Sequence, residues 1–349
     1  MNKCTVIIFA IITCFTSCEK QTLEKPWREI IELTGKRWHV EKSLGRAFSI
    51  NSSDYYLIVT NDIGKTHLTG FTYDSEHRVV NFAQHGTGPL EFKSAKVIPP
   101  STSIIEAYSI MSSQIIGFKL DSLFYHTGPH AYKAAGIPIV PIISMCKISD
   151  DLYLATGLFK DGRFAFIKDG KVTSHTGSFD DLNVQHKSLP ANVLSIAFQG
   201  NMFKPKHHNR FALAGRYGDF IEIYEVDTTH QSLKEIKSTL YEEPVFAIRD
   251  IHGSPNFSPN RETKWAYITV TGDESYFYAL YSGKIQALDK NFSSGSEIHV
   301  YDWSGLPIAC LKLTDYHAKS VAVFEGKLYT LVEDEDFGYD IVEYDSPFS

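Results

Sequence analysis

A unit of about 50 residues recurs along this chain, and this periodicity constrains the fold more than any other feature of the sequence. The unit is clearest from Lys264 to Leu313, where aromatic and β-branched residues alternate with polar ones. That alternation predicts half-buried strands, joined by short turns, at Trp265–Val270, Tyr276–Tyr281, Glu297–Tyr301 and Pro307–Leu313. Four consecutive antiparallel strands of this size form one blade of a β-propeller.

The same pattern occurs in six places along the chain. The innermost strands are expected at Arg46–Ile50, Lys93–Ile98, Ile143–Ile148, Val193–Phe198, Trp265–Val270 and Lys319–Phe324. The strands that follow them are expected at Tyr55–Thr60, Ser103–Tyr108, Leu152–Thr156, Arg210–Ala214, Tyr276–Tyr281 and Lys327–Leu331. The sequence therefore predicts an all-β fold, a six-bladed β-propeller of four-stranded antiparallel blades.

In each unit the third strand ends near an aspartate. These residues are Asp74, Asp121, Asp169, Asp227, Asp302 and Asp345. An aspartate at a strand end can accept hydrogen bonds from the backbone of the following turn. We interpret the six residues as turn formers at a blade rim; the alternative is a ring of ligands.

The sixth unit has only three strands before Ser349, and the missing strand is expected near the other end of the chain. Residues Arg37–Lys42 are suited to supply it. Closing the ring with this N-terminal strand pairs the two chain ends and removes an exposed sheet edge. We therefore expect the propeller to span residues 36–349.

The first residues have the pattern of a targeting segment. Lys3 precedes an apolar run, Thr5–Phe15, which is too short to span about 30 Å of hydrocarbon comfortably. The run ends in Phe15-Thr16-Ser17-Cys18, which resembles the lipobox of bacterial lipoproteins, whose cysteine is diacylated and becomes the new N-terminus. We expect residues 1–18 to be a lipoprotein signal peptide with Cys18 as the lipidation site.

Residues 19–35 are polar and charged, and we expect a tether there, with a short helix at Pro26–Leu33. The protein would then be anchored to the outer membrane, on its periplasmic or cell-surface side. Two cysteines remain in the propeller, Cys146 and Cys310. Because they fall in different predicted blades, we expect two isolated buried thiols rather than a disulfide.

The stretch Phe82-Ala-Gln-His-Gly-Thr-Gly-Pro-Leu-Glu-Phe92 resembles the Gly-x-Gly-Pro-Gly-Glu-Phe signature of six-bladed propeller lipoproteins from Bacteroidetes, described as TolB-like or NHL-like. Leu90 replaces the last glycine of that signature. Further stretches that resemble the same family are Ala155–Phe159, Pro205–Ala212, Tyr278–Lys284 and Val300–Gly305. The resemblance covers residues 36 to 348 and implies a fold and a cellular address, but no catalytic residue.

The glycine-rich stretch also has a physical interpretation. Gly86 and Gly88 permit positive φ, Pro89 fixes the next turn, and Glu91 can reach backbone N–H groups. We expect a turn that connects two blades. A phosphate-binding loop is disfavoured because no Lys-Ser or Lys-Thr follows the glycines.

Charge limits the ligands that the chain can bind. The net charge of −7 disfavours nucleic acid as a partner. Several predicted strand starts nevertheless carry basic residues, and propellers bind ligands where such starts converge on the central channel. The residues expected at this channel mouth are Arg46, Lys93, Lys264, His317 and Lys319. Together they would attract an anion such as a carboxylate or an acidic glycan; the alternative is that they face water and never meet.

Signatures of catalysis are missing: the sequence has no Gly-x-Ser-x-Gly and no His-Glu-x-x-His. We interpret His207-His208 as a surface turn and the acidic run Glu333–Asp336 as a hairpin tip. The sequence thus predicts no catalytic residue, no metal ligand and no cofactor. It favours a binding or protein-interaction module of the cell envelope; the alternative is a propeller lyase or hydrolase with a metal at the channel mouth.

Overall fold

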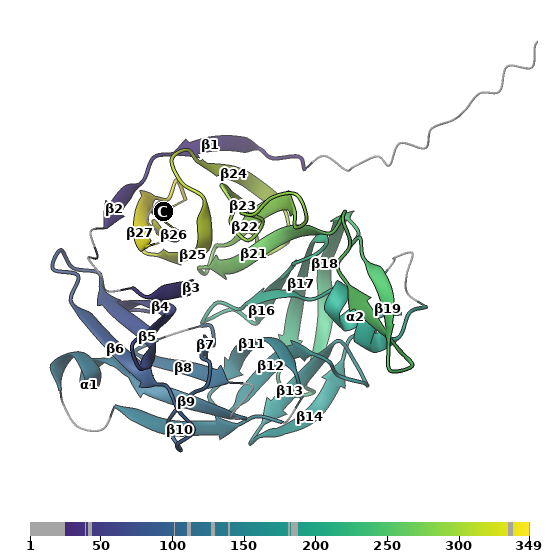
Figure 1. Ribbon diagram of the computed structural model, residues 1–349, viewed down its shortest axis with the longest axis horizontal. Coiled ribbons are helices and arrows are strands. Elements are labelled where there is room, and N and C mark those ends of the chain that lie inside the picture. The colour runs from purple at the N-terminus through teal and green to yellow at the C-terminus, as the bar shows by residue number, and fades with distance from the viewer. Residues whose placement is uncertain are drawn as a thin grey trace, which may run out of the picture.

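The computed structural model describes residues 25–38, 40, 44–100, 102–109, 113–126, 130–138, 140–180, 182, 188–333 and 338–348. Six antiparallel sheets surround a central axis (Figure 1), so the predicted six-bladed propeller is confirmed. The signal peptide, Cys18 and the first part of the tether lie outside the described residues. No helix in the described ranges is long and apolar enough to cross a membrane.

The first three blades use consecutive strands, numbered here from the axis outward. Blade 1 contains β3 (Arg46–Ser52), β4 (Tyr56–Ile63), β5 (Thr66–Thr72) and β6 (Val79–Gln84). Blade 2 contains β7 (Lys96–Val97), β8 (Ile104–Ser109), β9 (Gln114–Lys119) and β10 (Ala131–Gly136). Blade 3 contains β11 (Ile142–Ser149), β12 (Leu152–Gly157), β13 (Phe164–Lys168) and β14 (Lys171–Thr176).

The last three blades continue the same scheme. Blade 4 contains β15 (Gly200–Phe203), β16 (Arg210–Gly215), β17 (Asp219–Asp227) and β18 (Ser232–Glu242). Blade 5 contains β21 (Lys264–Gly272), β22 (Tyr276–Ile285), β23 (Glu297–Asp302), β24 (Pro307–Leu313) and, outermost, β1 (Glu29–Leu33). Blade 6 contains β25 (Ala318–Phe324), β26 (Lys327–Glu333), β27 (Tyr339–Asp345) and β2 (Lys36–Trp38).

Three elements lie outside this scheme. They are the helix α1 (Leu120–Tyr125), the helix α2 (Ala191–Ala197) and the hairpin of β19 (Ala247–Ile251) and β20 (Ser254–Ser258). The hairpin lies at the rim beside α2 (Figure 1).

The ring closes as expected, through strands from the two ends of the chain. β2 pairs antiparallel with β27, with Arg37 opposite Val342 and Trp38 opposite Ile341. The Trp38 indole is buried and donates a hydrogen bond of 3.0 Å to Glu343. Blade 6 is therefore completed by the N-terminal segment.

The expected helix at Pro26–Leu33 is wrong. Glu29–Leu33 is a strand that pairs parallel with β24, with Glu29 opposite Ala309 and Leu33 opposite Leu313. Ile31 and Leu33 pack on the core between blades 5 and 6, whereas Ile30 faces solvent. This period of two fits a strand, and an available sheet edge decides the conformation of so short a segment. From Lys25 onward the segment expected as a tether is thus folded against the propeller.

The innermost strand expected at Val193–Phe198 is also wrong. That stretch forms α2, which follows Pro190, and the innermost strand of blade 4 is β15. Val193, Leu194, Ala197 and Phe198 are buried, a spacing of one and four residues that places them on one face of a helix. A short apolar run of this kind fits either conformation by pattern alone.

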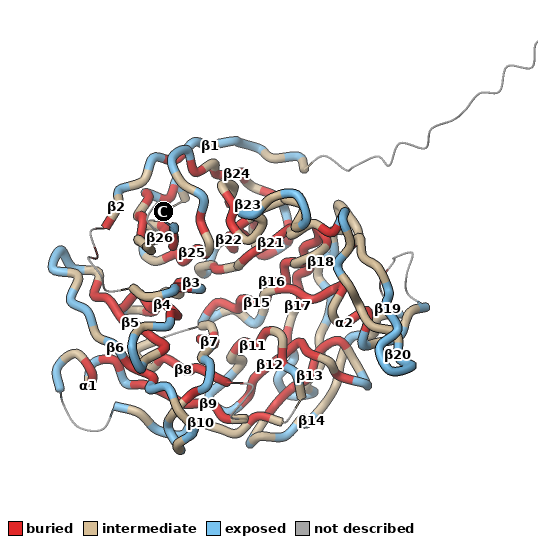
Figure 2. The backbone as a smooth tube through the Cα atoms, viewed as in Figure 1, coloured by how far each residue is buried: buried red, intermediate tan, exposed pale blue. Residues whose placement is uncertain are grey.

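The hydrophobic core is divided between the blades. In the described residues the buried apolar side chains form six clusters, one at each interface between neighbouring blades. Along β22, for example, Phe277 and Ala279 face blade 4, whereas Tyr278 and Leu280 face blade 6. Because both faces of each blade are covered, the backbone tube in Figure 2 is mostly red within the blades and pale blue at the loops.

Turn chemistry explains the aspartates at the strand ends. Asp74, Asp227 and Asp302 each accept hydrogen bonds from backbone N–H groups two to four residues later. Asp121 instead accepts the hydroxyl of Tyr56, and Asp345 pairs with Lys327. The interpretation as turn formers is thus confirmed for three of the six.

The glycine-rich stretch is a turn between blades 1 and 2, as expected. Glu91 accepts the N–H of Gly88 at 2.7 Å, and Phe92 is fully buried between the two blades. Neither Gly86 nor Gly88 has a left-handed conformation, so the expected positive φ is wrong. Glycine is needed for space, because a Cβ on Gly86 would lie 2.0 Å from the Glu91 carboxylate. Both cysteines of the propeller are free and buried, as predicted.

Candidate functional site

The central axis of the propeller contains a cavity of about 800 Å³, which all six blades line. Its walls include Ser49 of β3, Val97 of β7, Ser144 of β11, Asn201 of β15, Thr269 of β21 and Ser320 of β25. A volume of this size is typical of pockets for small-molecule ligands. The inner strands of the ring therefore enclose a site for a ligand rather than a packed core.

Basic side chains dominate the charged lining of this cavity. Among the described residues five cations line it, Arg46, Lys93, Lys96, Arg216 and Lys319. Two carboxylates line it as well, Asp62 and Glu333. Because the chain as a whole is acidic, this basic lining is a local feature that favours anions.

Both carboxylates already have partners. Asp62 lies 3.0 Å from Nδ1 of His67, whose Nε2 lies 3.2 Å from the carbonyl oxygen of Phe92. Glu333 forms an ion pair of 2.6 Å with Lys319. In the described part of the chain, Arg46, Lys93, Lys96 and Arg216 have no carboxylate within ion-pair distance.

Lys96 and Arg216 lie close together in the cavity. Lys96 donates a hydrogen bond of 2.8 Å to the carbonyl of Ile143 on the neighbouring blade. Cavity water reaches its side chain, yet the protein walls enclose the ammonium. This desolvation, together with the positive charge of Arg216, lowers the pKa of Lys96 to about 8. Two neighbouring cations without an acid between them form a site that an anion would stabilise.

Arg216 is held by stacking rather than by an ion pair. Its guanidinium lies 5.2 Å from the ring centroid of Trp265, which also lines the cavity. Its buried Nε has no hydrogen-bond partner within the protein. Stacking of this kind fixes the plane of the guanidinium for bidentate contact with a carboxylate or phosphate.

The opposite end of the axis has the reverse charge. A second cavity of about 330 Å³ is lined by Asp54, Asp273, Glu274 and Glu325. Its cation Lys206 pairs with Asp54 at 3.0 Å. β3 runs from Arg46 in the basic cavity to Ser52 beside the acidic one. The two ends therefore differ in sign, and an anion is attracted to one of them only.

Three of the five residues that the sequence places at the channel mouth line the basic cavity, namely Arg46, Lys93 and Lys319. Lys264 does not: it forms an ion pair of 2.8 Å with Glu242 on β18. Side chains alternate along β21, and the next residue, Trp265, faces the cavity instead. His317 precedes β25 and lies near Lys284 and Asp289; burial and Lys284 lower its pKa.

The sequence analysis missed Lys96 and Arg216. Lys96 falls inside an expected inner strand, where a search for basic strand starts does not detect it. Arg216 follows β16, the second strand of its blade, and reaches the axis from the turn before β17. No local pattern marks such a residue, because it reaches the channel only through the packing of blades.

One group of described residues has the composition of a metal site, and it lies outside the cavity. It consists of Glu297, His299 and Cys310 on β23 and β24. His207 and His208, by contrast, lie in a turn before β16, where the His207 N–H donates to Glu274.

Comparison with known proteins agrees with this architecture. A sequence profile described as TolB-like 6-blade propeller-like matches residues 37–325. No curated protein matches the sequence.

Two solved structures illustrate the similarity of fold. A protein from Bacteroides fragilis, described as exported, is 11% identical with a TM-score of 0.51, over 90% of this chain and 94% of that one. A luciferin-regenerating enzyme is 9% identical with a TM-score of 0.51, over 91% of this chain and 96% of that one. At this identity the similarity shows the fold alone. Because the profile match extends over most of a chain that folds into six blades, this protein belongs to the TolB-like six-blade propeller family.

Proposed function

We propose that this protein is a lipid-anchored propeller of the bacterial cell envelope that binds an anionic ligand in its central channel. The observation that carries the proposal is the basic cavity, with four described cations that no carboxylate neutralises. Hydroxyl and amide groups such as Ser49, Asn201 and Ser320 lie beside them. Together they favour a ligand with both carboxylates and hydroxyls, such as an acidic glycan.

A thermal-shift titration tests the ligand class. Full-length protein in detergent is heated with galacturonate oligomers, and with uncharged galactose oligomers of equal length as the control. At a concentration one hundredfold above Kd, a ligand adds about 2.7 kcal/mol of stability, which gives a clear rise in Tm. Only the acidic oligomers are expected to raise Tm. Equal shifts with both sugars, or none with either, would contradict the proposal.

Variants place the ligand in the channel. Arg46→Gln combined with Lys93→Gln should weaken binding, because both side chains line the cavity. Lys264→Gln is the matched control, since Lys264 is paired with Glu242 outside it. Binding should also weaken with added salt. An effect of Lys264→Gln as large as that of the double variant would place the ligand elsewhere.

Lipid anchoring at Cys18 belongs to the same proposal. The motif Phe15–Cys18 supports it, as do the resemblance of Phe82–Phe92 to Bacteroidetes lipoproteins and the similarity of fold to an exported Bacteroides fragilis protein. Mass spectrometry of the mature N-terminus should find an acylated Cys18, and Cys18→Ala should release the protein from the membrane fraction. An N-terminus at another residue would contradict it. An envelope protein as a second partner would be detected by co-purification.

A lyase or hydrolase with a metal at the channel mouth is the alternative, since a luciferin-regenerating enzyme shares the fold. The described lining offers Asp62, His67 and Glu333 as ligands. However, Asp62 and His67 bind each other and Glu333 binds Lys319. Metal that is lost on replacing Asp62 or His67 by Ala would favour this alternative over a binding module.

A further inference from the structure

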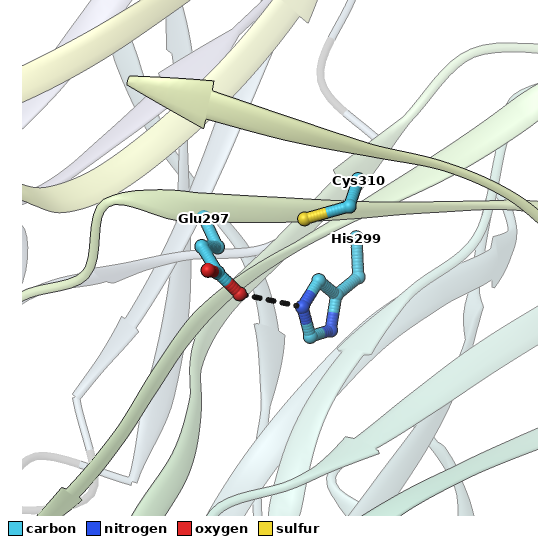
Figure 3. A group of neighbouring side chains, drawn as sticks. All are labelled: Glu297, His299 and Cys310. Carbon is cyan, nitrogen blue, oxygen red and sulfur yellow. Dashed lines mark hydrogen bonds and ion pairs between the residues drawn. The ribbon is translucent and has the colours of Figure 1, made fainter. Parts of the chain in front are cut away.

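A second polar site lies between blades 4 and 5, away from the channel. Glu297 and His299 are two residues apart on β23, and Cys310 on β24 is directly opposite His299. This register places the three side chains on one face of the sheet, where they point toward one another (Figure 3). Their ligand atoms all lie within 4.8 Å of one another.

We propose that Glu297, His299 and Cys310 bind one divalent transition-metal ion of the Zn²⁺ type. The ligand atoms would be a carboxylate oxygen, Nε2 and Sγ. A fourth coordination position stays open for water or for a donor atom of another molecule. Three protein ligands with an open position are typical of exchangeable or reactive zinc sites rather than closed structural ones.

The distances agree with this proposal. His299 Nε2 lies 3.4 Å from Glu297 Oε2. Tetrahedral zinc with nitrogen and oxygen ligands at about 2.0–2.1 Å holds two such atoms about 3.4 Å apart. Cys310 needs only a small movement, because a zinc–sulfur bond is about 2.3 Å long and its Sγ already lies within reach of both other ligands.

The donor set selects the class of metal. A thiolate and an imidazole are soft or intermediate ligands, which favour zinc, cobalt or copper. Calcium and magnesium take oxygen ligands almost exclusively. The site therefore differs in kind from an acidic cluster on a surface.

The surroundings hold His299 in the required orientation. Its Nδ1 lies 3.2 Å from the hydroxyl oxygen of Tyr267, which lies 3.1 Å from that of Tyr301. With a metal on Nε2, Nδ1–H donates to the oxygen of Tyr267, and this contact fixes the tautomer. Trp27, from the N-terminal segment, packs on the imidazole with ring centroids 4.6 Å apart.

Charge in this group also favours a divalent cation. Lys25 forms an ion pair of 2.6 Å with Asp219, and its Nζ lies 3.3 Å from His299 Nδ1. Two carboxylates, Asp219 and Glu297, thus share a single ammonium. Binding of a divalent ion with release of the Cys310 thiol proton to solvent adds one net positive charge, which makes the group neutral. The buried cluster is therefore complete in charge only when the ion is bound.

Access is available on one side. His299 and Cys310 are each 2% exposed, whereas the Glu297 side chain is 40% exposed. Glu297 therefore marks the side from which an ion enters and on which the open position lies.

Cobalt spectroscopy tests the proposal. Metal-free full-length protein in detergent is titrated with Co²⁺, which reports a thiolate ligand through a near-ultraviolet charge-transfer band. The wild-type protein should bind one Co²⁺ with this band, and Zn²⁺ should abolish it. Cys310→Ser should lose the band. Cys146→Ser is the matched control, because Cys146 is equally buried and lacks the other two ligands, and it should keep the band.

A second variant guards against a folding defect. Glu297→Gln changes the most exposed of the three ligands and should weaken Co²⁺ binding at least tenfold while the far-ultraviolet circular dichroism stays that of the wild type. A wild-type protein that binds no Co²⁺ at stoichiometric concentration would overturn the proposal. The same holds if Cys310→Ser, folded by circular dichroism, keeps the charge-transfer band. Because none of these residues lines the channel, failure here leaves the proposed anion binding untouched.

Discussion

At the scale of single residues, Lys96 and Arg216 give the channel its chemical character. Both are cations inside a cavity of the propeller, and neither has a carboxylate partner in the described residues. Arg216 is held flat against Trp265, whereas Lys96 titrates close to the physiological range. Anion binding in the channel should therefore depend on pH through Lys96.

The sign of this dependence follows from linkage. The pKa of Lys96 is about 8 in the free protein, and a bound anion raises it, so binding takes up a proton above pH 8. Affinity for a galacturonate oligomer, measured by calorimetry, should fall by at most about 30-fold between pH 7 and pH 9.5. Lys96→Met should remove most of this slope. A slope unchanged in that variant would assign the titration to another group.

Gly86 and Glu91 form a second pair whose coupling is measurable. Gly86→Ala would displace the Glu91 carboxylate from the Gly88 N–H and should lower the free energy of unfolding by about 1.5–3 kcal/mol. Glu91→Ala removes the same hydrogen bond. In urea unfolding, the double variant should therefore cost less than the sum of the two single variants. Additive effects would show that the methyl group and the carboxylate do not meet.

The sequence could predict the channel residues only in part. Arg46, Lys93 and Lys319 lie at or near the starts of inner strands, so the repeat alone brings them to one mouth. Lys264 has the same position in the repeat, but side-chain alternation turns it toward Glu242. Arg216, Glu297, His299 and Cys310 come together only through strand register and packing between blades, which no local pattern records.

At the scale of elements, polar contacts connect neighbouring blades within apolar interfaces. Arg163, which precedes β13, forms an ion pair of 3.0 Å with Glu222 on β17, and both are almost fully buried. The Tyr224 hydroxyl donates to the same carboxylate at 3.0 Å. A similar contact joins blades 2 and 3, where Glu106 accepts from Lys147 and Tyr153.

Breaking the first of these pairs should be costly. Glu222→Ala leaves a buried guanidinium without a partner and should lower the free energy of unfolding by about 3–5 kcal/mol. Arg163→Met combined with Glu222→Leu should restore much of that loss, because no buried charge remains. Chemical denaturation of the three proteins measures both effects. A double variant as unstable as Glu222→Ala would show that packing, not charge, is responsible.

The elements that the sequence misassigned are the short ones. Val193–Phe198 has apolar residues that suit a strand as well as a helix, and the neighbouring hairpin of β19 and β20 offers α2 a surface to pack on. Glu29–Leu33 becomes a strand because β24 offers it an edge. The long alternating runs were predicted correctly because their period of two persists over a whole blade.

At the scale of the whole molecule, the N-terminal segment joins the last two blades to the first. β1 adds to blade 5 and β2 completes blade 6. Trp38 then packs against His77 of blade 1, with ring centroids 3.8 Å apart. The ring is thus closed by residues from both ends of the chain.

Trp38→Ala tests this closure. The substitution removes a buried indole and its hydrogen bond to Glu343, and should lower the free energy of unfolding by about 3–5 kcal/mol. The control is Trp27→Ala, at the partly buried edge of blade 5, which should have a smaller effect. Both are measured by thermal denaturation. Equal losses would show that β2 has no special role in holding the ring.

The docking of the N-terminal segment also sets how far the disc can stand from a bilayer. Lys25 is already fixed to blade 4 through Asp219. An acyl chain on Cys18 would therefore hold the propeller on a leash whose fully stretched reach is about 25 Å. The rim at blades 4 and 5 would face the lipid headgroups, and the disc would have little freedom to tumble. A soluble ligand would then meet a channel of nearly constant tilt.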